Sequence, residues 1–109
     1  MSMKPKYHHM GIPTTQPRSG EAYLEMLKVH ATAFDANEYG IEWLRFDADS
    51  PMPMLIQQVP HVAFEVDDLD AAVKGKKILL APNEPMPGLR IAFIEHDGAP
   101  VEFLQFKKD

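Results

Sequence analysis

Two histidines and one glutamate are the side chains in this sequence best suited to chemistry. His9 and His61 each stand near the start of a segment that alternates like a β-strand, and each shares its face with a small residue, Gly11 or Ala63. Small neighbours leave room for a ligand beside an imidazole. Glu102 is a carboxylate in an otherwise apolar segment, and buried carboxylates are rare unless they are paired or bound to metal. We therefore expect function to depend on these three residues.

The composition limits what these residues can do. The absence of cysteine excludes thiolate sites and a cysteine nucleophile, so any metal must take nitrogen or oxygen ligands. The net charge of −5 and the scattered Lys and Arg residues predict no nucleic-acid partner. No apolar stretch has the length of a signal peptide or a membrane span, so we expect no membrane association and a cytoplasmic location. A length of 109 residues predicts a single domain, 1–109, with one core.

Hydrophobic periodicity predicts five elements in the first half of the chain. Alternation in 7–14 indicates a strand, and apolar residues on one face of 19–28 indicate a short amphipathic helix capped by Ser19. Three further strands are expected over 29–36, 40–46 and 54–58. The expected order is βαβββ.

The second half repeats this order after the proline at position 60. We expect a strand over 61–66, a short helix over 69–74 and a strand over 78–81. Segments 88–95 and 101–106 are expected to form a hairpin, because an Asp-Gly dipeptide between them readily adopts positive φ.

The repeated order predicts an α+β fold made of two tandem βαβββ modules, 7–58 and 61–106, that share one core. Aligning the last hairpins without a gap, from Gly40 and from Gly88, pairs Met54 with Glu102. The connection between the modules is short, so they pair edge to edge within one chain or are exchanged between two chains. Because exposed strand edges favour association, we expect a homodimer.

Three motifs in order resemble the vicinal oxygen chelate superfamily, which includes glyoxalase I, extradiol dioxygenases, methylmalonyl-CoA epimerase and the bleomycin-resistance proteins. The motifs are HMGIPT at the first strand, PHVAFEVDDLDAA at the fifth, and GLRIAFIEHDGAPVEFLQ at the end. The resemblance covers nearly the whole chain. It implies a curved mixed sheet around a cavity, with metal ligands on the first and last strands of each module.

Carried over to this sequence, the resemblance implies the metal ligands His9, His61 and Glu102. The fourth-strand ligand, usually Glu or Gln in glyoxalase-like members, falls on Met54, whose soft thioether suits a hard or borderline ion poorly. A three-ligand site is similar to the extradiol dioxygenases in its ligand count. Its donors suit Fe, Mn, Co, Ni or Zn as the divalent metal ion. A register slip of several residues would let Gln57 or Gln58 supply a fourth oxygen, although alternation places Gln57 on the other side of the strand from Met54.

The remaining polar side chains are given structural roles. By alternation, His8 points away from His9 and is expected at the surface. Glu65 is read as solvated, His96 as part of a turn, and Trp43 as core or cavity wall.

The function expected from these features is that of a metal-dependent enzyme acting on a small-molecule substrate with adjacent oxygens, by lyase, isomerase or dioxygenase chemistry. Glu102 is expected to act as a ligand alone or also as the catalytic base. The alternatives are a non-catalytic binding protein of the bleomycin-resistance type, and a degenerate module whose histidines are relics.

Overall fold

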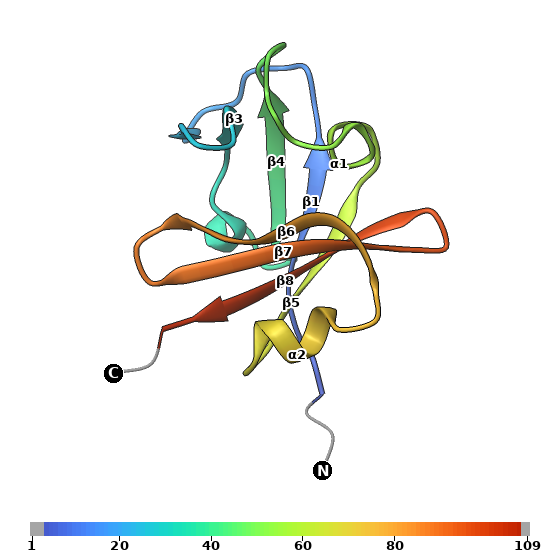
Figure 1. Cartoon of the computed structure of the whole chain (residues 1–109). Helices are drawn as coiled ribbons and strands as arrows, with labels where there is room; N and C mark the ends of the chain where they lie inside the picture. Colours follow the sequence, from blue (N-terminus) through green and yellow to red (C-terminus); the bar gives the residue numbers. More distant parts are fainter. Residues whose placement is uncertain (1–3, 108–109) are drawn as a thin grey trace.

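The computed structural model describes residues 4–107, which form a curved mixed sheet of eight strands with few helices (Figure 1). The expected α+β class and curved mixed sheet are confirmed. The ends of the predicted domain, residues 1–3 and 108–109, lie outside the described residues. The strands are β1 (Lys6–Pro13), β2 (Ala22–Leu24), β3 (Val29–Ala31), β4 (Ile41–Phe46), β5 (His61–Glu65), β6 (Lys77–Met86), β7 (Leu89–His96) and β8 (Ala99–Phe106). The helices are a 3-10 turn η1 (Phe34–Ala36), α1 (Met54–Gln58) and α2 (Leu69–Val73).

The strand order is β2-β3-β4-β1-β5-β8-β7-β6. Counted inward from each edge, the two halves have the same order, because β6, β7, β8 and β5 take the places of β2, β3, β4 and β1. At the centre β1 and β5 pair antiparallel, and each has a parallel partner on its other side, β4 beside β1 and β8 beside β5. The sheet twists strongly, so that β6 and β7 run across the direction of β1 and β4 (Figure 1). The four central strands therefore lie side by side and can direct side chains from four distant parts of the chain to one point.

Apolar side chains cover both faces of the sheet. Alternate residues of β7 belong to different clusters, with Ile91 and Phe93 in one and Ala92 and Ile94 in the other. The second cluster lies under α2, which packs against β6, β7 and β8. The first cluster includes Ile56 of α1 and forms the face on which the cavity described below opens.

The first half of the chain differs from the sequence prediction in its second element. Residues 19–28 do not form a helix, because β2 pairs antiparallel with β3 in a hairpin that turns at Glu25–Lys28. Lys28 adopts a positive φ of 50° in this turn. Tyr23 holds the hairpin in place, since its hydroxyl donates a 2.7 Å hydrogen bond to Asp47. The predicted strand 29–36 is confirmed only as far as position 31.

The predicted strand 54–58 is also wrong, because these residues form α1. Pro53 begins the helix, and Gln57 Nε2 donates to the backbone oxygen of Met52, which ties the helix to the preceding turn. A short apolar run has no periodicity that separates a strand from a buried helical turn. The fourth strand of the first half is instead β4, which pairs with β1 and β3.

The second half follows the prediction closely. The strand β5, the helix α2 and the β7–β8 hairpin lie where they were expected, and Asp68 caps α2 by accepting from the backbone N–H of Ala71. Asp97 and Gly98 form the hairpin turn with φ values of 49° and 85°. The strand β6 is longer than predicted and continues through 82–86, with three register shifts against β7. Among residues 4–107, no helix has the length and apolar character needed to cross a membrane.

Candidate metal centre

The three residues singled out in the sequence meet inside the protein. His9 of β1, His61 of β5 and Glu102 of β8 are all buried, with exposed fractions of 3%, 2% and 6%. Glu102 Oε1 lies 3.0 Å from His61 Nε2 and 3.3 Å from His9 Nε2. All three side chains come from a single chain.

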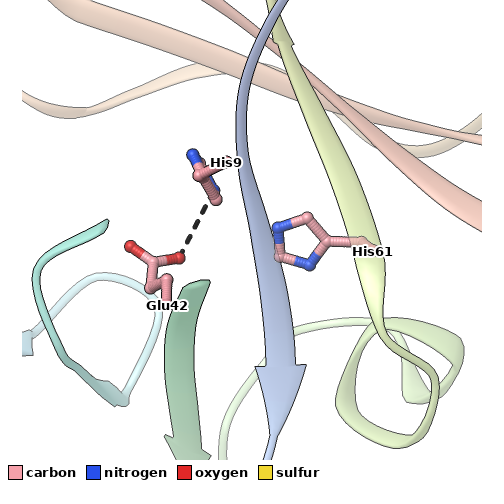
Figure 2. A group of neighbouring side chains, drawn as sticks. All are labelled: His9, Glu42 and His61. Atoms are coloured by element: carbon pink, nitrogen blue, oxygen red, sulfur yellow. Dashed lines mark ion pairs between the residues drawn. The ribbon is translucent and has the colours of Figure 1, made fainter. Parts of the chain in front are cut away.

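A fourth side chain, Glu42 of β4, joins this group, and the sequence analysis did not identify it. Its Oε1 lies 3.4 Å from His9 Nε2. Figure 2 shows His9, Glu42 and His61 directed toward one another from three neighbouring strands, and one potential ligand atom of each lies within 4.8 Å of the others. The four residues His9, Glu42, His61 and Glu102 are called the ligand cluster below.

Strand register explains the place of Glu42. Glu42 pairs with Gly11 across β4 and β1, and Glu102 pairs with Ala63 across β8 and β5. Gly11 and Ala63 stand at the same distance after His9 and His61, so the two glutamates occupy equivalent positions. The alignment that paired Met54 with Glu102 is therefore wrong, and Met54 is 59% exposed on α1.

The sequence contains a signal that identifies Glu42. The segments IEWLRF of β4 and VEFLQF of β8 share a branched residue, a glutamate, an aromatic residue, a leucine, a polar residue and a phenylalanine, in that order. Matching these segments in place of the preceding glycines pairs Glu42 with Glu102.

Small residues make room for both imidazoles. His61 lies across from Gly11 and His9 lies across from Ala63 in the antiparallel β1–β5 pair. A Cβ atom at Gly11 would overlap the His61 ring, at 2.7 Å from each ring nitrogen. The His61 ring therefore occupies the space of a side chain that Gly11 lacks.

The types of donor atom and the lack of hydrogen-bond partners for two ring nitrogens both suit a metal ion. Within residues 4–107, His9 Nε2 and His61 Nδ1 are buried without a hydrogen-bond partner, although buried polar atoms normally have one. His9 Nε2 lies close to both glutamates but is not aligned for a hydrogen bond with either. Two imidazoles and two carboxylates are a ligand set typical of Mn, Fe, Co, Ni or Zn. The residues present thus fit a divalent ion.

The ligand cluster has unusual electrostatics. Burial alone raises the pKa of Glu102, but the contacts and positive charge of His61 and His9 lower it to about 2. Burial is the main reason that the pKa of Glu42 is raised to about 7. Burial lowers the pKa of His9, and the contact with Glu102 and the charges of both glutamates outweigh it, so that this pKa is raised. A cation bound at this point would offset the free-energy cost of holding two carboxylates away from water.

His8 lies at the cavity and not on the outer surface, contrary to the prediction. The register of β1 against β5 shifts between Tyr7 and His9, and this bulge breaks the alternation that would separate His8 from His9. His8 Nδ1 lies 2.7 Å from His9 Nδ1. When His9 Nε2 is a metal ligand, His9 Nδ1 carries the proton and donates to His8, which fixes the orientation of the His9 ring.

The ligand cluster lies at one side of a cavity of about 250 Å³. The other lining residues are His8 and a set of apolar side chains from β2 to β4, η1, α1, β6, β7, β8 and the adjoining loops, namely Leu24, Leu27, Val29, Phe34, Leu44, Phe46, Met52, Ile56, Pro85, Met86, Leu89, Ile91, Phe93, Leu104 and Phe106. Trp43 does not line it and stacks instead under Arg18, 3.8 Å from the guanidinium carbon to the ring centre. His96 pairs with Asp97 beside the hairpin turn, as expected.

Comparison with known proteins gives the fold and no function. No protein-family model and no curated protein matches the chain. The crystal structure of hypothetical protein BH1468 from Bacillus halodurans C-125 is similar, with a TM-score of 0.73, 21% identity, and coverage of 96% of each chain. At this identity the similarity shows a shared fold.

Replacing Gly11 by Ala tests the contact with His61. We expect destabilisation by about 1 to 3 kcal/mol, because the added methyl displaces a packed ring. In a His61→Ala background the same change is expected to be neutral or stabilising, since alanine is better than glycine within a strand. Urea unfolding of the four proteins measures this cycle, and an equal cost of Gly11→Ala in both backgrounds contradicts the contact.

Replacing Glu42 by Gln tests the cost of burying its charge. A carboxyl whose pKa rises from 4.5 to about 7 on folding binds more protons in the folded state, so stability falls as pH rises through this range. The loss amounts to at most about 3 kcal/mol. With chelator present, Glu42→Gln is expected to lose less stability than the unmodified protein between pH 4.5 and pH 8. Identical pH profiles of unfolding free energy contradict this account.

Proposed function

We propose that this protein is a metal-dependent enzyme that binds a divalent ion through His9, Glu42, His61 and Glu102 and acts on a small substrate with adjacent oxygens. The observation that carries the proposal is the convergence of two imidazoles and two carboxylates, from the four central strands, at the buried side of an apolar cavity. Perturbed ionisable groups gathered in a cavity are typical of active sites.

Two modules of similar topology are part of the proposal. The symmetric strand order, the matching registers of Glu42 and Glu102, and the similar segments of β4 and β8 all support a duplication. The proposed boundary at residues 59–60 follows α1. In the described residues the first module passes from β1 to the β2–β3 hairpin without a helix, whereas the second has α2 before its β6–β7 hairpin. The resemblance to the vicinal oxygen chelate superfamily is supported by the same features.

The fourth ligand changes the expected reaction type. With Glu42 the ligand set matches what the resemblance implies for glyoxalase-like members, and lyase or isomerase chemistry is favoured over dioxygenase chemistry. The bound ion supplies Lewis-acid polarisation of substrate oxygens. The His61 ring is held in place because it fills the space beside Gly11, and His9 lies across from the small residue Ala63. The apolar walls exclude water from the reacting atoms.

Glu42 is the better placed of the two carboxylates to exchange a proton with a substrate. Both side chains line the cavity, and that of Glu42 is 20% exposed, compared with 8% for Glu102. Glu102 Oε1 lies 3.0 Å from His61 Nε2 and 3.3 Å from His9 Nε2, whereas the ion pair found for Glu42 among the described residues is the one with His9 at 3.4 Å. We therefore assign the proton transfer to a Glu42 carboxylate oxygen and the role of fixed ligand to Glu102, in place of the catalytic role expected of Glu102.

A non-catalytic binding protein is the second candidate. The apolar lining favours it, because such a cavity binds an apolar ligand without any metal. This candidate predicts that removing a member of the ligand cluster leaves ligand binding intact.

Metal content distinguishes the two candidates. Elemental analysis after incubation with Mn, Fe, Co, Ni or Zn is expected to find stoichiometric metal in the purified protein. Glu42→Gln and His61→Ala are each expected to weaken metal affinity by at least about 10-fold.

Met54→Ala is the matched control, because this exposed residue was the alternative fourth ligand. It is expected to bind metal as the unmodified protein does, and circular dichroism checks that each variant is folded. No stoichiometric metal in the unmodified protein with any of the five ions contradicts the enzyme and leaves the binding protein.

A further inference from the structure

The walls of the cavity indicate what kind of substrate it accepts. The part of the substrate away from the reacting polar atoms is called its body below. We infer that the substrate is a small uncharged molecule with an apolar body about the size of one substituted ring, whose adjacent polar atoms reach the ligand cluster. The inference rests on the proposed function in taking the ligand cluster as the reacting side of the cavity.

The apolar walls come from both halves of the chain. On one side, Leu27, Leu44 and Ile56 are almost fully buried around the cavity, and Ile91, Phe93 and Leu104 are their counterparts on the other side. Burial of an apolar substrate surface against such walls contributes about 25 cal/mol for each Å² removed from water. The walls therefore favour binding of hydrocarbon surface.

Polar groups are confined to one part of the lining. Of the described residues that line the cavity, only His8 and the ligand cluster carry a polar side chain, and none is a lysine, an arginine, an amide or a hydroxyl residue. A charged group on the substrate body would lose its hydration without gaining a counter-charge, which costs several kcal/mol. Phosphate, sulfonate and carboxylate groups are therefore disfavoured on the part of the substrate that lies within the cavity.

The volume limits the size of the body. A dry apolar cavity of about 150 Å³ accepts benzene. The cavity here, of about 250 Å³, accepts one ring with short substituents. A larger conjugate would extend into solvent.

Aromatic side chains line the rim of the cavity. The ring of Phe34 lies 4.3 Å from that of His8, and the ring of Phe106 lies 5.5 Å from it, measured between ring centres. Phe34 and Phe106 are both more than a third exposed. Their exposed ring surfaces add stacking contacts for a flat body.

Three hydroxamic acids test the inference, because all bind metals through the same two adjacent oxygens and differ only in their body. Benzohydroxamic acid has a neutral ring, 4-carboxybenzohydroxamic acid a charged ring, and acetohydroxamic acid only a methyl group. By isothermal titration, benzohydroxamic acid is expected to bind at least about 10-fold more tightly than either of the others, which corresponds to about 1.4 kcal/mol.

A charge placed on the wall is expected to change this preference. Met86 lines the cavity and is 42% exposed, so Met86→Lys places an ammonium group beside the ligand without a large burial cost. This variant is expected to reduce the preference for the neutral ring over the carboxylate by at least about 10-fold. Ile78→Lys is the matched control on the same strand, because Ile78 is 43% exposed and does not line the cavity.

The ratios of affinity among the three hydroxamic acids test the inferred substrate class independently of whether the protein binds a metal. They are measured in metal-loaded protein and in protein treated with chelator, and the preference for the neutral ring is expected in both. Equal or reversed affinities, no binding of benzohydroxamic acid at millimolar concentration, or equal effects of the two lysine variants would overturn the inference. Absence of stoichiometric metal with the preference retained would overturn the proposed enzyme and leave the substrate class standing.

Discussion

The close approach of β1 and β5 is the constraint on which the rest of the site depends. The His61 ring lies where a side chain at position 11 would be, and His9 lies across from the small residue Ala63. This antiparallel pair brings the two imidazoles together, with ring centres 5.7 Å apart. The parallel strands on either side then add a glutamate each, at positions that pair with Gly11 and Ala63. One glycine thus permits an arrangement that draws on four strands.

This arrangement is costly to the fold and useful for binding. Glu102 and the two imidazoles are buried beside apolar walls with the half-buried Glu42, and Glu102 lies close to a ring nitrogen of each histidine. Glu42 keeps a raised pKa, which means that the metal-free fold is less stable when this group is charged. A cation bound here would offset this cost, which is consistent with the proposed metal site. The apolar walls contribute in the same direction, because charges interact more strongly where water is excluded.

Sequence reasoning singled out His9 and His61 because they stand at matching points of the repeated pattern beside small residues, and Glu102 because it is a carboxylate in an otherwise apolar segment. The resemblance to the superfamily implied the same three ligands. Sequence reasoning failed for His8, because a bulge in β1 breaks the alternation and leaves no mark in residue types. Glu42 was missed for another reason. Gly40 and Gly88 both have positive φ, but Gly40 precedes β4 whereas Gly88 precedes β7, so an alignment that starts at these glycines matches non-equivalent strands. Periodicity shows which face a residue occupies, but it does not show which distant strands pair, and the β1–β4 pairing is long-range.

The position of the ion tests this account most directly. Crystals of the protein grown with Mn²⁺ would give an anomalous difference map in which the metal is located independently of the protein phases. The account predicts a peak among His9, Glu42, His61 and Glu102, with imidazole nitrogens and oxygens of both glutamates within bonding distance. A peak elsewhere with none in the ligand cluster, or an ion bound by the histidines with Glu42 turned away, would contradict it.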